Sequence, residues 1–222
     1  MIHAVTSSCR RDLELVAQLH GQLYDHGVFH HVFVEPAELD VFDYAIGSGR
    51  VAVRTKPVGG DNGLGRGGAI VRWHCHRQLL TTVADDDTVV HIDSDVYFVD
   101  PSMIDELACD VGQIKGYADP NTFTLHDGDS FRHLSGMLIA VRGDCFKRSM
   151  GLSLGELWAA TERLLAVDLS PSEDVVASYL YQCRGGSRLL TNFHETRPRD
   201  MSHRYDSDYV ESARQQGSAV IA

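Results

Sequence analysis

Two aspartates at alternate positions, Asp93 and Asp95, are the residues of this chain whose spacing most directly suggests chemistry. They follow the apolar run from Val89 to Ile92, which predicts a strand covered on both faces of a parallel sheet. Residues i and i+2 of an extended chain point to the same side, so both carboxylates can face one point. Two carboxylates placed together repel unless a cation lies between them. A hard divalent ion that also holds a phosphate-bearing ligand is therefore the favoured occupant.

The D-x-D pattern alone is common, and its context decides its meaning. The chain contains four such pairs: Asp85/Asp87, Asp93/Asp95, Asp127/Asp129 and Asp206/Asp208. The second pair follows a strand that reads as buried, whereas the others lie in a polar turn, a glycine-containing loop and a polar C-terminal stretch. Ligand sites of open α/β sheets lie just outside the carboxyl ends of strands. Asp93 and Asp95 are therefore the predicted metal-binding pair.

Composition limits the classes of function. The chain has 222 residues, enough for one sizeable α/β domain, and a formal net charge of −11 that argues against a general nucleic-acid or anionic-membrane surface. A local basic groove stays open, because several basic residues fall between positions 50 and 77. No apolar run is long enough for a membrane span, and the first residues do not resemble a signal peptide. The five cysteines contain no C-x-x-C and indicate reduced thiols of a cytoplasmic protein.

The elements that must position the aspartates begin with a β-α-β unit. Residues 2–6, 29–34 and 51–53 are predicted strands, and Ser7 and Ser8 can cap a helix after the first. A helix is predicted over 69–84, and further strands over 111–115, 137–141 and 189–193. The expected fold class is α/β, with a mostly parallel mixed sheet and helices on both faces.

This order of a strand, D-x-D, a second apolar run and Pro101 resembles the metal-binding motif of GT-A-fold glycosyltransferases. The resemblance implies GT-A architecture over residues 1–195, with a nucleotide-sugar-binding half (1–100), an acceptor half (101–195) and a C-terminal tail (196–222). That tail is expected to be mobile or to cover the acceptor site. The resemblance also implies contacts to the nucleotide sugar from eight residues: Thr6, Ser7, Arg11, Glu35, Arg77, Gln78, Ser94 and Gly136. Helix capping and turn formation are the competing explanation for the first four.

Two loops are candidates for binding roles. Residues 56–68 contain six glycines and predict a loop, either a lid over a bound donor or a plain surface loop. The G-x-G-x-x-G pattern within it does not follow the first strand of its unit, as a dinucleotide site requires, and is taken as coincidental. Residues 117–130 predict a long polar loop that binds the acceptor. At Gly136 the lack of a side chain would let a sugar approach the backbone.

The remaining candidates are acidic residues and a histidine late in the chain. Ser170, Pro171 and Glu173 can form a capping box at the start of a helix, which gives Glu173 a structural explanation beside a catalytic one. Asp174 has no such explanation, and the resemblance implies that it is the general base of an inverting enzyme. The resemblance also makes His194 a third metal ligand, which favours Mn²⁺ over Mg²⁺ because imidazole suits manganese better.

The sequence thus predicts a metal-dependent glycosyltransferase that moves a sugar from a nucleoside-diphosphate sugar, such as a UDP- or GDP-sugar, to an unknown acceptor hydroxyl. Three alternatives stay open. The segment IDSDVYF also fits the first motif of haloacid-dehalogenase-like phosphatases, in which Asp93 would be the nucleophile. A nucleotidyltransferase uses the same metal–diphosphate chemistry. A non-catalytic nucleotide-sugar binder would keep Asp93 and Asp95 but lack a base on the acceptor side.

Overall fold

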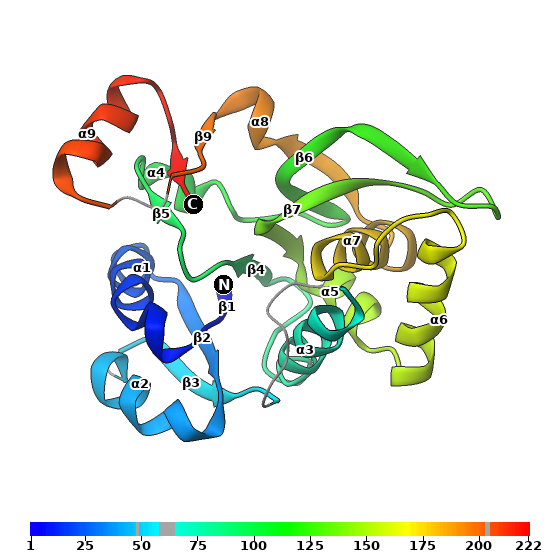
Figure 1. Ribbon diagram of the computed structural model, residues 1–222, viewed down its shortest axis with the longest axis horizontal. Helices are drawn as coiled ribbons and strands as arrows, with labels where there is room; N and C mark the ends of the chain where they lie inside the picture. Colours follow the sequence, from blue (N-terminus) through cyan, green and yellow to red (C-terminus); the bar gives the residue numbers. More distant parts are fainter. Residues whose placement is uncertain (48, 58–64, 203–204) are drawn as a thin grey trace.

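A computed structural model describes residues 1–47, 49–57, 65–202 and 205–222 (Figure 1). Its strands are β1 (Ile2–Ser7), β2 (Phe29–Val34), β3 (Val51–Thr55), β4 (Thr88–Ile92), β5 (Tyr97–Phe98), β6 (Gln113–Thr124), β7 (Ser130–Arg142), β8 (Arg188–Asn192), β9 (Arg199–Asp200) and β10 (Val220–Ile221). Its α-helices are α1 (Leu13–Asp25), α2 (Leu39–Ile46), α3 (Gly65–Arg77), α4 (Ser102–Asp105), α5 (Gly143–Met150), α6 (Leu154–Leu165), α7 (Glu173–Tyr179), α8 (Phe193–Thr196) and α9 (Ser207–Gln215). Short helical turns are η1 (Arg10–Asp12), η2 (Pro36–Glu38) and the π-helical η3 (Leu180–Arg184).

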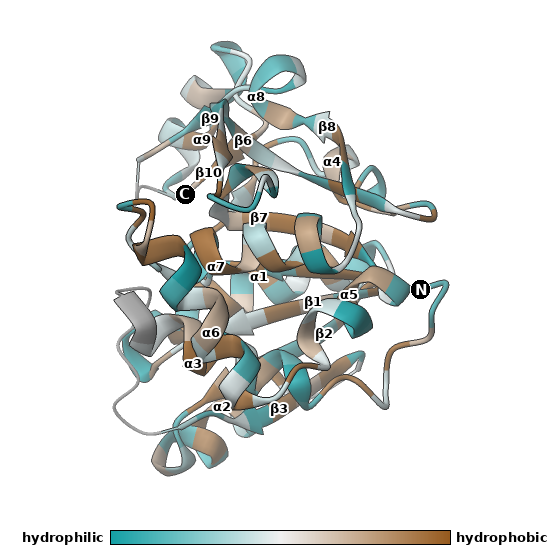
Figure 2. Cartoon of the chain, turned by 90° about the vertical axis from the view of Figure 1, so that its right-hand side faces the viewer, coloured by the Kyte–Doolittle hydropathy of each residue, from teal (hydrophilic) through white to brown (hydrophobic). Residues whose placement is uncertain are grey.

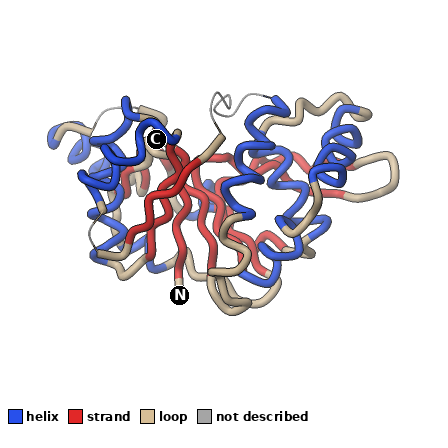
Figure 3. The backbone as a smooth tube through the Cα atoms, turned by 90° about the horizontal axis from the view of Figure 1, so that it is seen from below, coloured by secondary structure: helices blue, strands red, loops and turns tan. Residues whose placement is uncertain are grey.

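A mixed sheet of seven strands, in the order β3-β2-β1-β4-β7-β6-β8, forms the centre of the molecule. Strands β3, β2, β1 and β4 are parallel neighbours, β7 is antiparallel to both β4 and β6, and β8 runs parallel to β6. The view from below shows this layer of strands with helices on either side (Figure 3). The predicted fold class, a mostly parallel mixed α/β sheet covered by helices, is confirmed.

Strand alternation divides the apolar side chains between the two faces of the sheet. Successive residues of a strand point to opposite faces. Accordingly Val89 packs in the hydrophobic cluster that contains residues of α3, α5, α6 and α7, whereas Val90 packs in the cluster that contains residues of α1 and the C-terminal segment. Brown, hydrophobic segments run through the strands in the middle of Figure 2. By the same alternation His91 and the residue after the strand, Asp93, lie on the α3 and α7 side.

The functional end of the sheet follows from its topology. Strand β1 lies between β2 and β4, so the chain leaves β1 toward one edge of the sheet and later returns to its other side at β4. In open α/β sheets such a switch point leaves a crevice outside the carboxyl ends of the two strands. Ser7 ends β1, and Asp93 directly follows β4. Both residues therefore lie at this crevice.

The prediction that residues 117–130 form an acceptor-binding loop is wrong. Most of this segment belongs to β6 and β7, which form a long antiparallel hairpin around a turn at residues 125–129. The Asp119-Pro120-Asn121 sequence reads as a loop because proline cannot donate to a β ladder. Here β6 has left its partner β8 after Gly116, and its pairing with β7 is irregular between Ala118 and Thr122. The strand can therefore hold a proline at an unpaired edge.

Three other expectations about local structure need correction. The helix predicted over 69–84 is α3, which begins earlier and ends at Arg77, with turns after it. No side chain of Ser7 or Ser8 caps the helical turn η1 or the helix α1. The glycine-rich segment predicted as a loop enters α3 at Gly65, and its residues 58–64 lie outside the described residues.

The segment after residue 195, expected to be a tail, is folded onto the domain. Strand β10 lies between β5 and β9 in a second sheet of three strands, and α9 precedes it. Val220 and Ile221 are fully buried. This segment adds Arg199, Met201, Tyr205 and Ala222 to the walls of the crevice. Among the described helices none is long and apolar enough to cross a lipid bilayer.

Candidate active site

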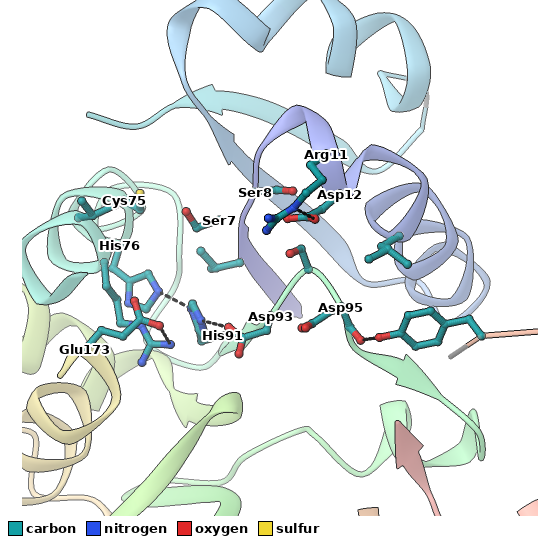
Figure 4. Close-up of a pocket in the computed structure, with 16 residues that line it drawn as sticks. Ser7, Ser8, Arg11, Asp12, Cys75, His76, His91, Asp93, Asp95 and Glu173 are labelled. Carbon is teal, nitrogen blue, oxygen red and sulfur yellow. Dashed lines mark hydrogen bonds and ion pairs between the residues drawn. The ribbon is translucent and has the colours of Figure 1, made fainter. Parts of the chain in front are cut away.

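A cavity of about 560 Å³ opens at the carboxyl ends of β1 and β4 (Figure 4). Ser7, Ser8, Arg11 and Asp12 come to it from β1 and the turn that follows. Figure 4 shows them opposite Asp93 and Asp95, which lie on the loop after β4. The charged residues of the lining are four carboxylates (Asp12, Asp93, Asp95, Glu173) and two guanidinium groups (Arg11, Arg72), a formal net charge of −2. We call this the β1–β4 cavity.

A second cavity, of about 350 Å³, shares a wall with the first. Asp93, Asp95 and Glu173 line both cavities. The other lining residues of the second cavity are Ser135, Gly136 and Met137 of β7, Ser172 and Asp174 at the start of α7, and Arg199, Met201 and Ala222 of the C-terminal segment. We call this the β7–α7 cavity. Three carboxylates thus stand at the junction of two spaces large enough for two ligands to meet.

The D-x-D residues form a turn and not an extended segment. Strand β4 ends at Ile92, and the backbone N–H of Val96 donates to the carbonyl of Asp93 at 3.2 Å. The alternation of an extended strand therefore does not apply to this pair, although Asp93 and Asp95 still reach the same two cavities. The hydroxyl of Tyr205 donates to the backbone carbonyl of Asp95, which ties the C-terminal segment to the loop.

A buried histidine supports Asp93 from the strand. Nε2 of His91 lies 3.2 Å from Oδ1 of Asp93, and the exposed fractions of the two side chains are 6% and 42%. Burial raises the pKa of Asp93, but the hydrogen bond with His91 and the charge of Arg72 outweigh it, so the pKa falls below its usual value. Burial also lowers the pKa of His91. The carboxylate is therefore ionised and the imidazole neutral near pH 7.

This histidine is the middle of a chain of hydrogen-bonding side chains. Nδ1 of His91 lies 3.3 Å from Nε2 of His76 on α3, and Nδ1 of His76 lies 3.1 Å from the hydroxyl of Tyr181 in η3. All three side chains are buried. Burial lowers the pKa of His76 well below its usual value, so this ring is neutral as well.

Arg72 of α3 supplies a buried positive charge beside the carboxylates. Its side chain is 3% exposed, and Nη2 lies 3.4 Å from Oε1 of Glu173 and 3.3 Å from the carbonyl of Gly136. Its Nε and Nη1 are buried without a hydrogen-bond partner among the described residues. Sequence reasoning noticed Arg72 only as part of a basic cluster between residues 50 and 77. That cluster does not form one groove, since Arg50 donates to the carbonyl of Gly27 and Arg77 to that of Leu152.

The donor set suits a divalent cation. His91, Asp93 and Glu173 are the described residues whose potential ligand atoms all lie within 4.8 Å of one another. Oxygen ligands at 2.0–2.6 Å from an ion are separated by about 3–5 Å, which this grouping satisfies. The formal charge of −2 on the cavity lining has the magnitude that a divalent ion would neutralise. The group differs from the expected set of Asp93, Asp95 and His194.

His194 lies elsewhere. It is an exposed residue of α8, and its ring packs edge to face on Tyr117 with centroids 5.4 Å apart. Its backbone N–H is bound by the side chain of Asn192, which caps this short helix. His194 is absent from the linings described above and from the group of potential ligands.

The acidic pair Glu173 and Asp174 opens α7, as the sequence suggested, but without a capping box. The N-cap residue is Ser172, whose side chain makes no capping hydrogen bond to the helix backbone. Glu173 is therefore released from the capping role and contacts Arg72 instead. Asp174 accepts hydrogen bonds from the hydroxyl of Ser172 and, at 2.9 Å, from Nε2 of His133.

His133 joins Asp174 to a second carboxylate. Its Nδ1 lies 2.5 Å from Oδ2 of Asp119 on β6. The hydrogen bond to Asp174 raises the pKa of His133, and the partnership with Asp119 adds to the effect. Burial raises the pKa of Asp174, but the hydrogen bonds from His133 and Ser172 outweigh it and hold that pKa well below its usual value. Asp174 is thus an oriented, ionised carboxylate at the β7–α7 cavity.

Of the eight residues expected to contact the nucleotide sugar, four line the two cavities and four do not. Ser7, Arg11 and Ser94 line the β1–β4 cavity, and Gly136 lines the β7–α7 cavity. At Gly136 an added Cβ would lie 3.2 Å from Cβ of Asp174 and 3.5 Å from Nη2 of Arg72. Four residues, Thr6, Glu35, Arg77 and Gln78, line neither cavity. Thr6 is buried against His30, and the Gln78 amide donates to the carbonyl of Thr55.

Several solved structures of glycosyltransferases share the fold of this chain. The chain superposes over its full length on 54% of the glycosyltransferase GlyE of Streptococcus pneumoniae, with a TM-score of 0.54 and 10% identity. For a glycosyltransferase involved in glycosylation of the major capsid of PBCV-1, 99% of the chain matches 91% of that protein, with a TM-score of 0.54 and 10% identity. For mouse xyloside xylosyltransferase 1 the values are 100% and 97%, with a TM-score of 0.50 and 7% identity.

The chain has a GT-A-like fold. At these identities the likeness concerns the fold and not the activity. The chain spans about half of the length of GlyE, 54%. No protein-family model matches the sequence, and no curated protein matches it either. The features of this chain that bear on its activity are the two cavities and the carboxylates between them.

Proposed function

We propose that the protein is a metal-dependent glycosyltransferase that moves a sugar from a nucleoside-diphosphate sugar to a hydroxyl group of an acceptor. The observation that carries this proposal is the junction of two cavities at Asp93, Asp95 and Glu173. A transferase of this kind needs a donor and an acceptor on either side of one reacting carbon. The switch-point position of the β1–β4 cavity favours the nucleotide there.

Asp93 and Glu173, with Asp95 beside them, would hold a divalent ion such as Mn²⁺ or Mg²⁺. The bound ion supplies Lewis-acid neutralisation of the diphosphate that leaves. Arg72 would add a fixed positive charge, because two of its nitrogens have no described partner and it lines the same cavity. Ser7, Arg11 and Ser94 would hydrogen-bond the nucleotide part of the donor. His194, Arg77, Gln78, Thr6 and Glu35 have no role in this version of the site.

The acceptor would lie in the β7–α7 cavity. In the transfer step the acceptor oxygen forms a bond to the anomeric carbon, the bond from that carbon to the diphosphate oxygen breaks, and the acceptor proton passes to Asp174. Asp174 is ionised and oriented by His133, which suits a proton acceptor, although its low pKa makes it a weak base. Gly136 leaves room for the acceptor next to this carboxylate.

The position of Asp93 in the fold disfavours the haloacid-dehalogenase-like alternative. Its nucleophilic aspartate belongs to the first strand of its domain, whereas Asp93 follows β4 of a GT-A-like sheet. A non-catalytic nucleotide-sugar binder would lack a base on the acceptor side. Asp174 at the β7–α7 cavity argues against that alternative.

Thermal unfolding with UDP-, GDP- and ADP-sugars, each with and without Mn²⁺, tests the proposal. A ligand that binds only the native state raises the midpoint temperature. We expect one class of nucleotide sugar to do so only when Mn²⁺ is present, and Asp93→Asn to abolish the rise. Asp208→Asn is the matched control, because it changes an exposed aspartate in an identical Asp-Ser-Asp sequence. No metal-dependent rise with any nucleotide sugar, or release of phosphate from a simple phosphomonoester that Asp93→Asn abolishes, would refute the proposal.

A further inference from the structure

The hydrogen-bond chain behind Asp93 joins three separate elements of the fold. It starts at the hydroxyl of Tyr181 in η3, passes through His76 of α3 and His91 of β4, and ends on Oδ1 of Asp93. The three heavy-atom separations are 3.1, 3.3 and 3.2 Å. Tyr181, His76 and His91 are 1%, 1% and 5% exposed, so hydrogen bonds to bulk water do not compete with these contacts.

The direction of the chain follows from counting donors and acceptors. A neutral imidazole has one N–H and one bare nitrogen. If Tyr181 donates to Nδ1 of His76, then Nε2 of His76 carries the hydrogen and donates to Nδ1 of His91. Nε2 of His91 then carries its hydrogen and donates to the Asp93 carboxylate, which has only acceptor atoms. Every link pairs one donor with one acceptor.

The opposite direction leaves two faults. Nδ1–H of His91 would donate to His76, and His76 to the oxygen of Tyr181. The Tyr181 hydroxyl hydrogen would then be buried without another acceptor among the described residues. Nε2 of His91 would present a lone pair to the Asp93 carboxylate at 3.2 Å. Buried donors without acceptors are strongly disfavoured in native structures.

We propose that His91 is a positioning residue, which Tyr181 and His76 hold as the Nε2–H tautomer so that it donates to Asp93 and does not itself bind the metal. The proposal rests on the proposed function for its consequence, since Asp93 is the carboxylate that would hold the cation. Nitrogen Nε2, the atom nearest the carboxylate, is occupied by its hydrogen. Asp93 and Glu173 then remain as the ligands of the His91, Asp93 and Glu173 group.

The series of hydrogen bonds also explains why polar residues occupy two buried helical positions, His76 and Tyr181, and one buried strand position, His91. His91 interrupts an apolar strand, and the ring of His76 lies 5.7 Å from that of Phe146. A hydrophobic side chain at either position would pack without needing a partner. These hydrogen bonds instead fix the rotation of the Asp93 carboxylate, as groups that hydrogen-bond to metal ligands do.

Long-range ¹H–¹⁵N NMR of the histidine side chains in the full chain tests the direction. Metal-free protein at pH 7.5 is expected to show His76 and His91 as Nε2–H tautomers. Added Mg²⁺, which is diamagnetic, is expected to leave the His91 tautomer unchanged. A Nδ1–H tautomer of His91 in the free protein, or loss of its Nε2–H signal when Mg²⁺ binds, would overturn the proposal.

A substitution of Tyr181, the member of the hydrogen-bond series farthest from Asp93, supplies the second readout. Tyr181→Phe removes only the hydroxyl, and we expect it to mix the tautomers of His76 and to weaken Mg²⁺ and Mn²⁺ binding about tenfold, at the low end of effects behind metal ligands. Tyr179→Phe is the matched control: its hydroxyl belongs to a different contact, with Arg163, and both affinities should stay unchanged. Equal affinities in the wild type and Tyr181→Phe would contradict the positioning role.

Failure of the proposed function would look different. If neither cation binds the wild-type chain, the metal-dependent transferase is wrong, while the tautomers of the metal-free protein still decide whether the chain of donors runs toward Asp93. Should Tyr181→Phe not fold, the tautomer measurement and the Mg²⁺ titration of the unaltered protein remain sufficient.

Discussion

Acid should destabilise this protein through two histidines that the fold buries in β2. His30 and His31 are both fully buried. Burial lowers the pKa of each from 6.5 to about 3, and neighbouring histidines strengthen the effect: His20 and His31 for His30, and His3 for His31. Between pH 3 and pH 6.5 both rings are therefore neutral in the folded chain, whereas they titrate near pH 6.5 in the unfolded chain.

The sign and size of the effect follow from proton linkage. A histidine with a lowered folded pKa contributes stability that is complete above pH 6.5 and is lost as the pH falls toward 3, because the unfolded chain binds more protons. At pH 5.5, one unit below the unfolded pKa of 6.5, protonation of each histidine stabilises the unfolded state by RT ln(1 + 10), about 1.4 kcal/mol. The two together remove about 2.8 kcal/mol, a large part of the roughly 5–15 kcal/mol that stabilises a typical domain.

Urea unfolding at pH 7.5 and pH 5.5, followed by circular dichroism, measures this loss. His30→Gln keeps a neutral polar side chain, so the variant should lose about 1.4 kcal/mol less than the wild type between the two pH values, and His30→Gln/His31→Gln about 2.8 kcal/mol less. His74→Gln is the control, because His74 is exposed, and its loss should equal that of the wild type. If the double variant and the wild type lose the same free energy, the burial argument for β2 is wrong.

Three further predictions concern the site. Asp174→Asn should lower sugar transfer by about 10²–10⁴-fold, while Mn²⁺-dependent nucleotide binding in a thermal-shift assay stays unchanged. Gly136→Ala places a methyl group 3.2 Å from Cβ of Asp174 and should abolish acceptor binding in calorimetry, whereas Gly155→Ala, with nothing closer than 4.0 Å, should have no effect. Arg72→Met removes a positive charge beside Glu173 and should tighten Mn²⁺ binding several-fold but weaken binding of the nucleoside diphosphate, as titration calorimetry would show. Weaker binding of both ligands to Arg72→Met would indicate a collapsed site.

The parts of the fold that the sequence predicts are those in which local pattern and burial agree. β1 and β2 are short segments whose predicted limits lie within a residue of the observed ones. The apolar run from Val89 to Ile92 predicts a buried strand before the D-x-D pair, and all five residues of β4 are buried. Parallel strands that are covered on both faces have nearly continuous apolar sequences, which makes them recognisable from the sequence.

Elements that depend on distant partners could not be predicted in the same way. β10 has two residues, and its place in the second sheet depends on Phe98 and Arg199, which lie far from Val220 in the sequence. No periodicity extends over two residues. The hairpin of β6 and β7 is not predictable from local pattern for a related reason, since Pro120 is compatible with a strand only because the adjacent strand β8 has already ended.

The candidate site also has predictable and unpredictable parts. The carboxylates that would bind the metal can be found from the sequence, whereas the residues that hold them in place cannot be found so directly. Asp93 and Glu173 are recognisable because carboxylates stand at the ends of elements, where open α/β sheets bind ligands. Arg72, His76 and Tyr181 lie inside helical segments, and their roles arise only when α3 and η3 pack against β4. One signal was present in the sequence: a histidine inside a buried strand needs polar partners, so His91 implied buried hydrogen-bonding groups on whichever elements cover that face. His76 of α3 and Tyr181 of η3 are such groups, and they lie on the side of the sheet on which Asp93 is held.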